Sequence, residues 1–298
     1  MTKAQAQMAY RVSIKGMCIN FMLFIIKGVL GIFIHSVSLI SDAVHSLSDI
    51  ASTLVVLFGI KLSNKPADNG HPYGHEKMEC IIALFLGLML MVIGIAIARE
   101  GIRKITHLAY VDYNNTVLHI FAALSAMLSI MAKEWMYRFT IKCARMIGSA
   151  SMAADAWHHR ADALSSIGSL IGIIGICMGY PIIDGIACVI IACFILKAAF
   201  DICADACGKL VDSAGSPAVI NHIQELVREN REVLAIDMIR TRQFGAKLYV
   251  DLEITLDRKI SFEHSHQIAH CLHDNIEANI AEVKHCMIHV NPSMDSNV

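Results

Sequence analysis

The chain has 298 residues, of which 55% are hydrophobic and only 17% are charged. Soluble globular proteins carry about 25% charged residues, so this composition is typical of a protein that lies largely in a membrane. The formal net charge of −1 and the lack of any basic run give no reason to expect a nucleic-acid partner.

Six apolar segments follow one another through the first two thirds of the sequence, each near the length of about 20 residues that crosses the hydrocarbon core. They cover roughly residues 12–34, 37–62, 78–98, 117–135, 152–178 and 182–204. An even number of spans places both termini on one side of the membrane. The loops assigned to the cytoplasm carry most of the flanking lysines and arginines, which predicts cytoplasmic termini: Lys61, Lys65, Lys77, Lys133, Arg138, Lys142 and Arg145. The opposing signal is Arg99, Arg103 and Lys104 after the third span.

After about Asp212 the sequence becomes charged and alternating, which predicts a membrane domain over residues 1–212 and a soluble domain over residues 213–298. The patterns of the tail predict a helix over 217–232, strands over 234–242 and 247–256, a helix over 261–279 and a strand over 283–290. Ser261 is well suited to cap the second of these helices. The predicted fold class is therefore an all-α six-helix transmembrane bundle followed by an α+β domain of αββαβ order, which is ferredoxin-like.

Ten cysteines occur without any CxxC pair, and most lie inside apolar spans. Buried cysteine behaves as a small apolar residue, so reduced thiols are expected rather than a disulfide framework. The soluble domain contains two of them, Cys271 and Cys286, which suits a cytosolic location for that domain.

The second and fifth apolar spans share one motif, small–Asp–Ala–x–His–x–x–small–Asp, over residues 41–49 and 154–162. Residues four apart lie on one face of a helix, so His45 shares a face with Asp49 and His158 shares one with Asp162. Two such helices facing each other present two imidazoles and two carboxylates, a set that can close a tetrahedron around zinc.

Ionisable side chains within a membrane are costly and usually mark ion or proton pathways. The alternative is that each histidine–aspartate pair only hydrogen-bonds its neighbours in the bundle. Two matching pairs on separate spans favour a transport site over that alternative.

These paired HxxxD motifs, the six spans and the αββαβ tail resemble the cation diffusion facilitator family of divalent metal transporters over nearly the whole chain. The resemblance implies that His45, Asp49, His158 and Asp162 form the transport site. It also implies a homodimer in the inner (plasma) membrane that exchanges metal for protons, and not an enzyme.

The ligand types favour zinc, because imidazole suits zinc whereas all-oxygen sites suit manganese and magnesium. Iron, manganese, cadmium and cobalt stay open as alternative cargoes of the same fold. Metal binding requires neutral histidine and ionised carboxylate, so binding releases protons and proton antiport is expected.

A second cluster lies in the loop between the second and third spans. Asp68, His71 and His75 have spacings typical of metal ligands, and glycine and proline residues around them predict a turn. A polar turn without metal is the alternative, and the family resemblance favours a peripheral metal site.

The soluble domain is rich in histidine. Matching its strands to bacterial members of the family points to a metal site at the dimer interface formed by Asp237, Asp251, His266 and His289, with zinc as a regulatory ion. Asn291 stands where a metal-bridging carboxylate often occurs, and solvated histidines are the alternative. The resemblance further implies an ion pair between Lys77 and Asp212 that stabilises the dimer.

Two other classes of function fit the sequence less well. An intramembrane metalloenzyme would need more histidine clusters within the spans, and the sequence has no HExxH motif. A metal sensor that does not transport would not need the duplicated motif on two spans.

Overall fold

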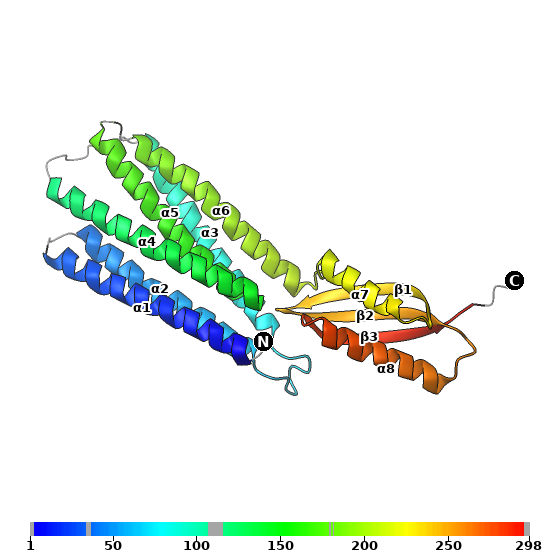
Figure 1. The fold of residues 1–298 in the computed structure, drawn as a ribbon. Coiled ribbons are helices and arrows are strands. Elements are labelled where there is room, and N and C mark those ends of the chain that lie inside the picture. The colour runs from blue at the N-terminus through cyan, green and yellow to red at the C-terminus, as the bar shows by residue number, and fades with distance from the viewer. Residues whose placement is uncertain (1–2, 34–36, 107–115, 179, 181, 295–298) are drawn as a thin grey trace. The chain divides into compact units, whose positions relative to one another are not determined.

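The computed structural model describes residues 3–33, 37–106, 116–178, 180 and 182–294. The chain divides into two units, Met1–Ala206 and Cys207–Val298. Each unit is built differently, the first from long helices and the second from short helices on a sheet (Figure 1).

Within the described residues, the first unit is a bundle of six long helices that run lengthwise beside one another (Figure 1). They are α1 (Lys3–Phe33), α2 (Val37–Ser63), α3 (Lys77–Thr106), α4 (Thr116–Ile147), α5 (Ala150–Cys177) and α6 (Ile182–Leu210). Most of these helices extend several residues beyond the apolar segments, because polar residues continue the helix past the hydrocarbon region.

Helix α4 contains the positive charges that the sequence analysis assigned to the loop before the fifth span. Lys133, Arg138, Lys142 and Arg145 all lie within Thr116–Ile147, and α5 begins three residues after α4 ends. The segment between the fourth and fifth predicted spans is therefore largely helical. Strong helix formers such as alanine, methionine and lysine extend the helix where hydropathy alone ends the span.

Among the described helices, α1, α2, α3 and α6 are long and apolar enough to cross a membrane by composition alone. Helices α4 and α5 carry charged residues in their middle, including Lys133 on α4 and Asp162 on α5. The unit is thus helical and of membrane type, and spanning by α4 and α5 remains a prediction.

The surface of this unit is strongly apolar while its interior holds polar side chains. Phe33, Val92 and Phe194 are more than 60% exposed, whereas Asn20 and Asp49 are buried. A soluble protein would show the reverse distribution. This distribution fits a bundle whose outer face contacts lipid and whose interior carries the chemistry.

Helices α3 and α6 approach each other very closely. Glycine recurs every seventh residue on α3, at Gly87, Gly94 and Gly101. A Cβ atom on Gly101 would lie 2.9 Å from the carbonyl oxygen of Gly185 on α6. Small residues at membrane helix interfaces allow such backbone contact, so this stripe fixes α3 against α6.

The second unit confirms the αββαβ order. Its elements are α7 (Pro217–Glu229), β1 (Val233–Phe244), β2 (Lys247–Leu256), α8 (Phe262–Asn279) and β3 (Val283–Pro292). The sheet order is β1-β2-β3, with β1 antiparallel and β3 parallel to β2. Ser216 and Ser261 cap the two helices by accepting hydrogen bonds from the backbone N–H groups of Val219 and His264.

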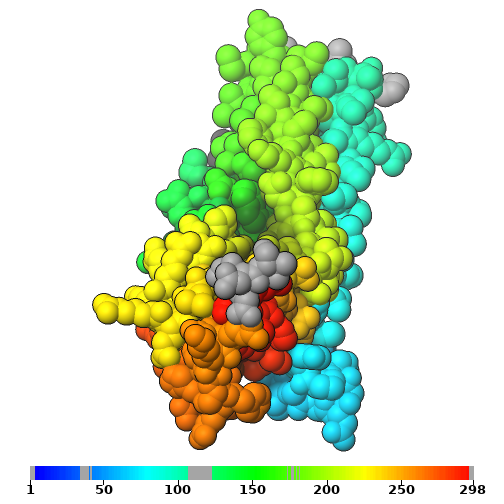
Figure 2. All heavy atoms as spheres, turned by 90° about the vertical axis from the view of Figure 1, so that its right-hand side faces the viewer, coloured from blue at the N-terminus to red at the C-terminus, as the bar shows by residue number. Residues whose placement is uncertain are grey.

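Both helices of this unit pack on one hydrophobic core. Ile223 of α7, Ile276 of α8 and Ile254 of β2 are completely buried in it. In the space-filling view, α7 in yellow, α8 in orange and β3 in red all reach the face turned to the viewer (Figure 2). The alternation predicted for β2 follows from this single buried face.

Candidate transport site

The two HxxxD motifs lie on α2 and α5, and their side chains meet between these helices. His45 Nε2 of α2 is 3.4 Å from Asp162 Oδ1 of α5, and His158 Nε2 of α5 is 3.3 Å from Asp49 Oδ1 of α2. Within α2, His45 Nε2 is 3.9 Å from Asp49 Oδ1. Each histidine therefore reaches across to the aspartate of the other helix.

Three of these four groups gather around one point. Single ligand atoms of His45, Asp49 and Asp162 all lie within 4.8 Å of one another, the arrangement expected of side chains that could hold a metal ion. His158 joins the group through Asp49. Asp49 is 1% exposed, so water screens little of the charge in the site.

A lysine that was not predicted to be part of the site contacts both of its aspartates. Lys133 of α4 is 3% exposed and its Nζ donates to Oδ2 of Asp49 and, at 3.0 Å, to Oδ2 of Asp162. Helix α4 thus completes the site from a third side. Its polar side chains recur every fourth residue, at Ser125, Ser129 and Lys133, and this spacing was a sequence signal that marked an inward-facing stripe.

A second histidine–aspartate couple lies beside the site. His159 Nε2 of α5 is 3.6 Å from Asp155 Oδ2, and Thr53 of α2 donates a hydrogen bond of 3.3 Å to Asp155 Oδ1. These three side chains are all buried. They link α2 to α5 one helical turn from the HxxxD residues and keep the two helices in register.

A polar cavity of about 340 Å³ opens next to the site. Charged side chains on its wall are Lys27, Asp42, Lys133 and Asp162, and His45 lies there as well. Lys27 is buried and its Nζ is 3.8 Å from Asp42 Oδ2, so it faces the bundle interior rather than the lipid surface. Ser165, Ser166 and Ser169 continue the polar wall along α5.

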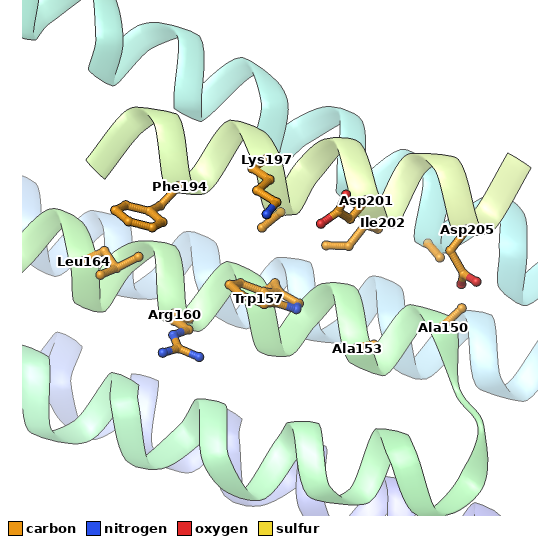
Figure 3. Close-up of a pocket in the computed structure, with 12 residues that line it drawn as sticks. Ala150, Ala153, Trp157, Arg160, Leu164, Phe194, Lys197, Asp201, Ile202 and Asp205 are labelled. Carbon is orange, nitrogen blue, oxygen red and sulfur yellow. The ribbon is translucent and has the colours of Figure 1, made fainter. Parts of the chain in front are cut away.

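A second cavity, of about 580 Å³, lies between α5 and α6 (Figure 3). Lys197 and Asp201 project from α6 toward α5, which contributes Trp157 (Figure 3). Arg160 lies with its Cζ 4.4 Å from the ring centroid of Tyr137 on α4. The wall carries carboxylates but no imidazole, so it lacks the donor set of the site between α2 and α5.

The loop between α2 and α3 brings Asp68, His71 and His75 together, with ligand atoms within 4.8 Å of one another. Asp68 accepts hydrogen bonds from the backbone N–H of His71, at 2.9 Å, and from Lys65 Nζ, at 2.6 Å. The Lys65 ammonium, followed by the His71 N–H, holds the pKa of Asp68 well below its usual range. His75 is buried, whereas His71 is exposed.

The four residues predicted to bind metal in the soluble unit lie on different elements. Asp237 is on β1, Asp251 on β2, His266 on α8 and His289 on β3. Among the described residues, no three of them gather within one chain. A site shared by two copies of the chain therefore stays a prediction.

Asp237 has its own partners within the chain. Its carboxylate accepts hydrogen bonds from Thr255 Oγ1, at 2.7 Å, and from Asn291 Nδ2, at 3.0 Å. The Asn291 and Thr255 hydrogen bonds lower the pKa of Asp237. Asn291 therefore acts as a donor to the aspartate, a role that a bridging carboxylate at this position could not fill.

The structure brings together a different cluster in the soluble unit. Oε1 of Glu277 lies 3.3 Å from His273 Nε2 and 3.2 Å from His285 Nδ1. The same oxygen accepts a hydrogen bond from the backbone N–H of Cys286. This cluster was not predicted from the sequence, because its members come from α8 and β3 and only the fold of the unit brings them together.

The ion pair predicted between Lys77 and Asp212 joins residues of the two separate units. Lys77 begins α3, and Asp212 follows α6 with a φ of 62°. A left-handed backbone at a residue with a side chain is uncommon and marks the tight turn between α6 and α7. The pairing itself stays a prediction.

Comparisons with known proteins agree with this architecture. The family described as the cation efflux transmembrane domain matches residues 13–211, and the cation efflux protein cytoplasmic domain matches residues 216–293. An uncharacterized transporter of Methanocaldococcus jannaschii is 32% identical over 91% of this chain and 94% of its own length. The manganese efflux system protein MneP of Bacillus subtilis is 29% identical over 98% of this chain and 99% of its own. The magnetosome protein MamB of a Magnetospira species is 30% identical over 89% of each chain.

The matched domains together cover nearly the whole sequence, and the relatives align along almost their full length. The chain therefore belongs to the cation diffusion facilitator family: it is a membrane transporter for divalent metal cations and not an enzyme.

Proposed function

We propose that the protein exports zinc in exchange for protons, with His45, Asp49, His158 and Asp162 as the ligands of the transported ion. The observation that carries the proposal is the reciprocal contact of the two motifs, in which each histidine lies within 3.4 Å of the aspartate on the other helix. This crossing places both aspartates, which are largely buried, between the two imidazoles.

The donor set supports zinc as the cargo. Zinc prefers four tetrahedral ligands with nitrogen, sulfur or oxygen donors, and two imidazoles with two carboxylates meet that preference. Manganese and magnesium prefer oxygen donors in larger number. Replacing both imidazoles by carboxylates would suit manganese better.

Exchange for protons follows from the same ligands. Each histidine binds the metal with a lone pair that a proton would otherwise occupy, so metal entry releases protons and proton entry expels metal. The cavity beside His45 and Asp162 gives protons and ions a shared polar route to these groups.

Manganese or iron efflux is the second candidate, and one observation favours manganese. The relative MneP, named as a manganese efflux protein, aligns over 98% of this chain. The two imidazoles of the site argue for zinc. Transport rates for zinc, manganese, iron and cadmium, compared in one preparation, decide between these cargoes.

The experiment is zinc uptake into liposomes that contain the purified chain and have an acidic interior. Asp162→Asn should lower the initial rate at least about 100-fold, since even a change in the outer shell of a metal site costs about 10- to 100-fold. Asp201→Asn is the matched control, because its carboxylate lies on α6 at the other cavity. Its rate should stay within about twofold of the wild type. Full zinc transport by a well-folded Asp162→Asn protein would remove the site assignment.

The orientation and assembly belong to the same proposal. The chain works as a homodimer in the inner membrane with both termini and the soluble unit in the cytoplasm. A regulatory metal is bound between two copies of the chain by four side chains, those of Asp237, Asp251, His266 and His289. Lys77 pairs with Asp212. The test is the distance between two spin labels, one on each soluble unit of the dimer, measured with and without zinc. A distance that zinc leaves unchanged contradicts this assembly.

A further inference from the structure

Lys133 places a positive charge in a site that is proposed to bind a positive ion. Its Nζ contacts both aspartates, and the side chain is 3% exposed. Two buried carboxylates near each other repel, and an ammonium between them offsets that repulsion when no metal is bound. Offsetting this repulsion explains the position of Lys133 only in part. The ammonium also contacts just one oxygen of each aspartate and leaves the other oxygen to a histidine.

The two oxygens of each aspartate have different partners. Oδ2 of Asp49 and Oδ2 of Asp162 both accept from Lys133. Oδ1 of Asp162 faces His45, and Oδ1 of Asp49 faces His158. The lysine thus occupies one side of both carboxylates and the imidazoles lie on the other side.

We propose that Lys133 is a positioning residue that determines metal specificity by making each aspartate a one-oxygen ligand. With Oδ2 held by the ammonium, only Oδ1 of Asp49 and of Asp162 is available to the ion, alongside the two imidazoles. This inference rests on the proposed ligand set. It assigns a role in selectivity to a residue outside that set.

Coordination chemistry gives the direction of the effect. Zinc accepts four ligands, so two single carboxylate oxygens and two imidazole nitrogens satisfy it. Manganese favours a larger number of oxygen ligands, which two-oxygen binding by carboxylates helps to supply. Blocking Oδ2 therefore disfavours manganese more than zinc.

The positive charge itself does not discriminate between these ions. An ammonium repels zinc and manganese equally, because both carry two charges and would occupy the same place. Removing the charge changes the affinity for both ions by the same factor, which cancels in their ratio. The ratio of manganese to zinc transport therefore reports on ligand geometry alone.

The fold supports a fixed position for Lys133. It lies on α4 in line with Ser125 and Ser129, which are also buried, and helix α4 packs along α5. A lysine that swung away on metal binding would leave both aspartates free to bind with two oxygens. In that case its loss would raise the affinity for both metals and leave their ratio unchanged.

The test is transport by Lys133→Met and Lys133→Arg in liposomes, with zinc and manganese measured separately. Lys133→Met should raise the manganese-to-zinc ratio about tenfold, the lower range for changes around a metal's ligands. Lys133→Arg keeps a donor of the same charge and should keep the ratio within about threefold of the wild type. A ratio that is unchanged in Lys133→Met overturns the proposal.

A spectroscopic measurement on the wild type keeps the proposal testable if Lys133→Met does not fold. Cobalt bound to four tetrahedral ligands absorbs strongly in the visible range, and six-coordinate cobalt absorbs weakly. The proposal expects the strong spectrum in the wild type, and its loss in Asp162→Asn shows that it arises from the transport site. A weak spectrum from cobalt that competes with zinc for this site overturns one-oxygen binding.

Failure of this inference is distinguishable from failure of the proposed function. If Asp162→Asn abolishes transport and Lys133→Met leaves the metal ratio unchanged, the ligand set stands and the role of Lys133 falls. If Asp162→Asn transports normally, both fall together.

Discussion

The site between α2 and α5 and the cluster in the loop before α3 use the same three side-chain types, yet they differ in how they are held. In both, a lysine contacts an aspartate that also faces histidine. The loop cluster draws its members from residues 65–75, whereas the histidine–aspartate contacts between α2 and α5 join residues more than 100 positions apart. The first is a local feature of sequence and the second a product of helix packing.

Burial separates the two sites further. The side chain of Asp49 is 1% exposed and that of Asp68 is 36% exposed. Charges in the loop are screened by water and salt, while those in the bundle interact through a medium of low polarity. We therefore predict that the site between α2 and α5 controls transport and depends on the packing of the bundle. The loop cluster is expected to bind metal weakly and independently of the bundle.

The largest expected effect follows from removing one imidazole of the site between α2 and α5. His45→Ala should reduce zinc transport at least about 100-fold, because it removes one of the four proposed ligands of the ion. Initial rates in liposomes check this, with circular dichroism to verify folding. If His45→Ala keeps more than a tenth of the rate, the two sites do not differ as described.

The dependence on helix packing can be measured at Gly101. A Cβ atom there would lie 2.8 Å from Cys188 Cβ, so Gly101→Ala should destabilise the bundle by about 1–3 kcal/mol. Thermal unfolding in detergent measures the change. Gly28→Ala is the matched control, since the nearest atom to its Cβ would be 3.8 Å away. Equal unfolding temperatures for the two variants would contradict the close contact of α3 with α6.

A smaller effect is expected in the loop. His71→Ala removes an imidazole that is 64% exposed and should lower zinc transport by less than about threefold. The same liposome assay measures it beside His45→Ala. A loss as large as that of His45→Ala would show that the loop site lies on the transport path.

The smallest effect concerns the charge on Asp68. The pKa of Asp68 is lower in the folded chain than in the unfolded chain, where it is about 3.9. The charged carboxylate therefore stabilises the fold above the unfolded pKa, and this contribution is lost as the pH falls through the folded pKa. Asp68→Asn should therefore lower the unfolding temperature equally at pH 7 and pH 5, by less than about 2 °C. A difference that disappears already at pH 5 would mean that Lys65 does not hold the carboxylate in its charged form.

Sequence patterns alone predicted much of the fold because periodicity and caps are local. The αββαβ order, the cap at Ser261 and the strand over 247–256 all agree with the structure. Helix ends in the membrane unit were predicted less well, since hydropathy marks the hydrocarbon limits and not the end of the hydrogen-bonded helix. Helix α4 continues twelve residues past the predicted end at 135, to Ile147.

For the site between α2 and α5, the sequence indicated which residues could bind metal, because ligand type and four-residue spacing can be read along a single helix. His45 with Asp49, and His158 with Asp162, were visible in this way. Only the tertiary structure decided that each histidine faces the aspartate of the other helix, and that Lys133 lies between the carboxylates. The physical reason is that a single helix fixes spacing along its own axis, whereas packing of α2, α4 and α5 fixes which charges meet.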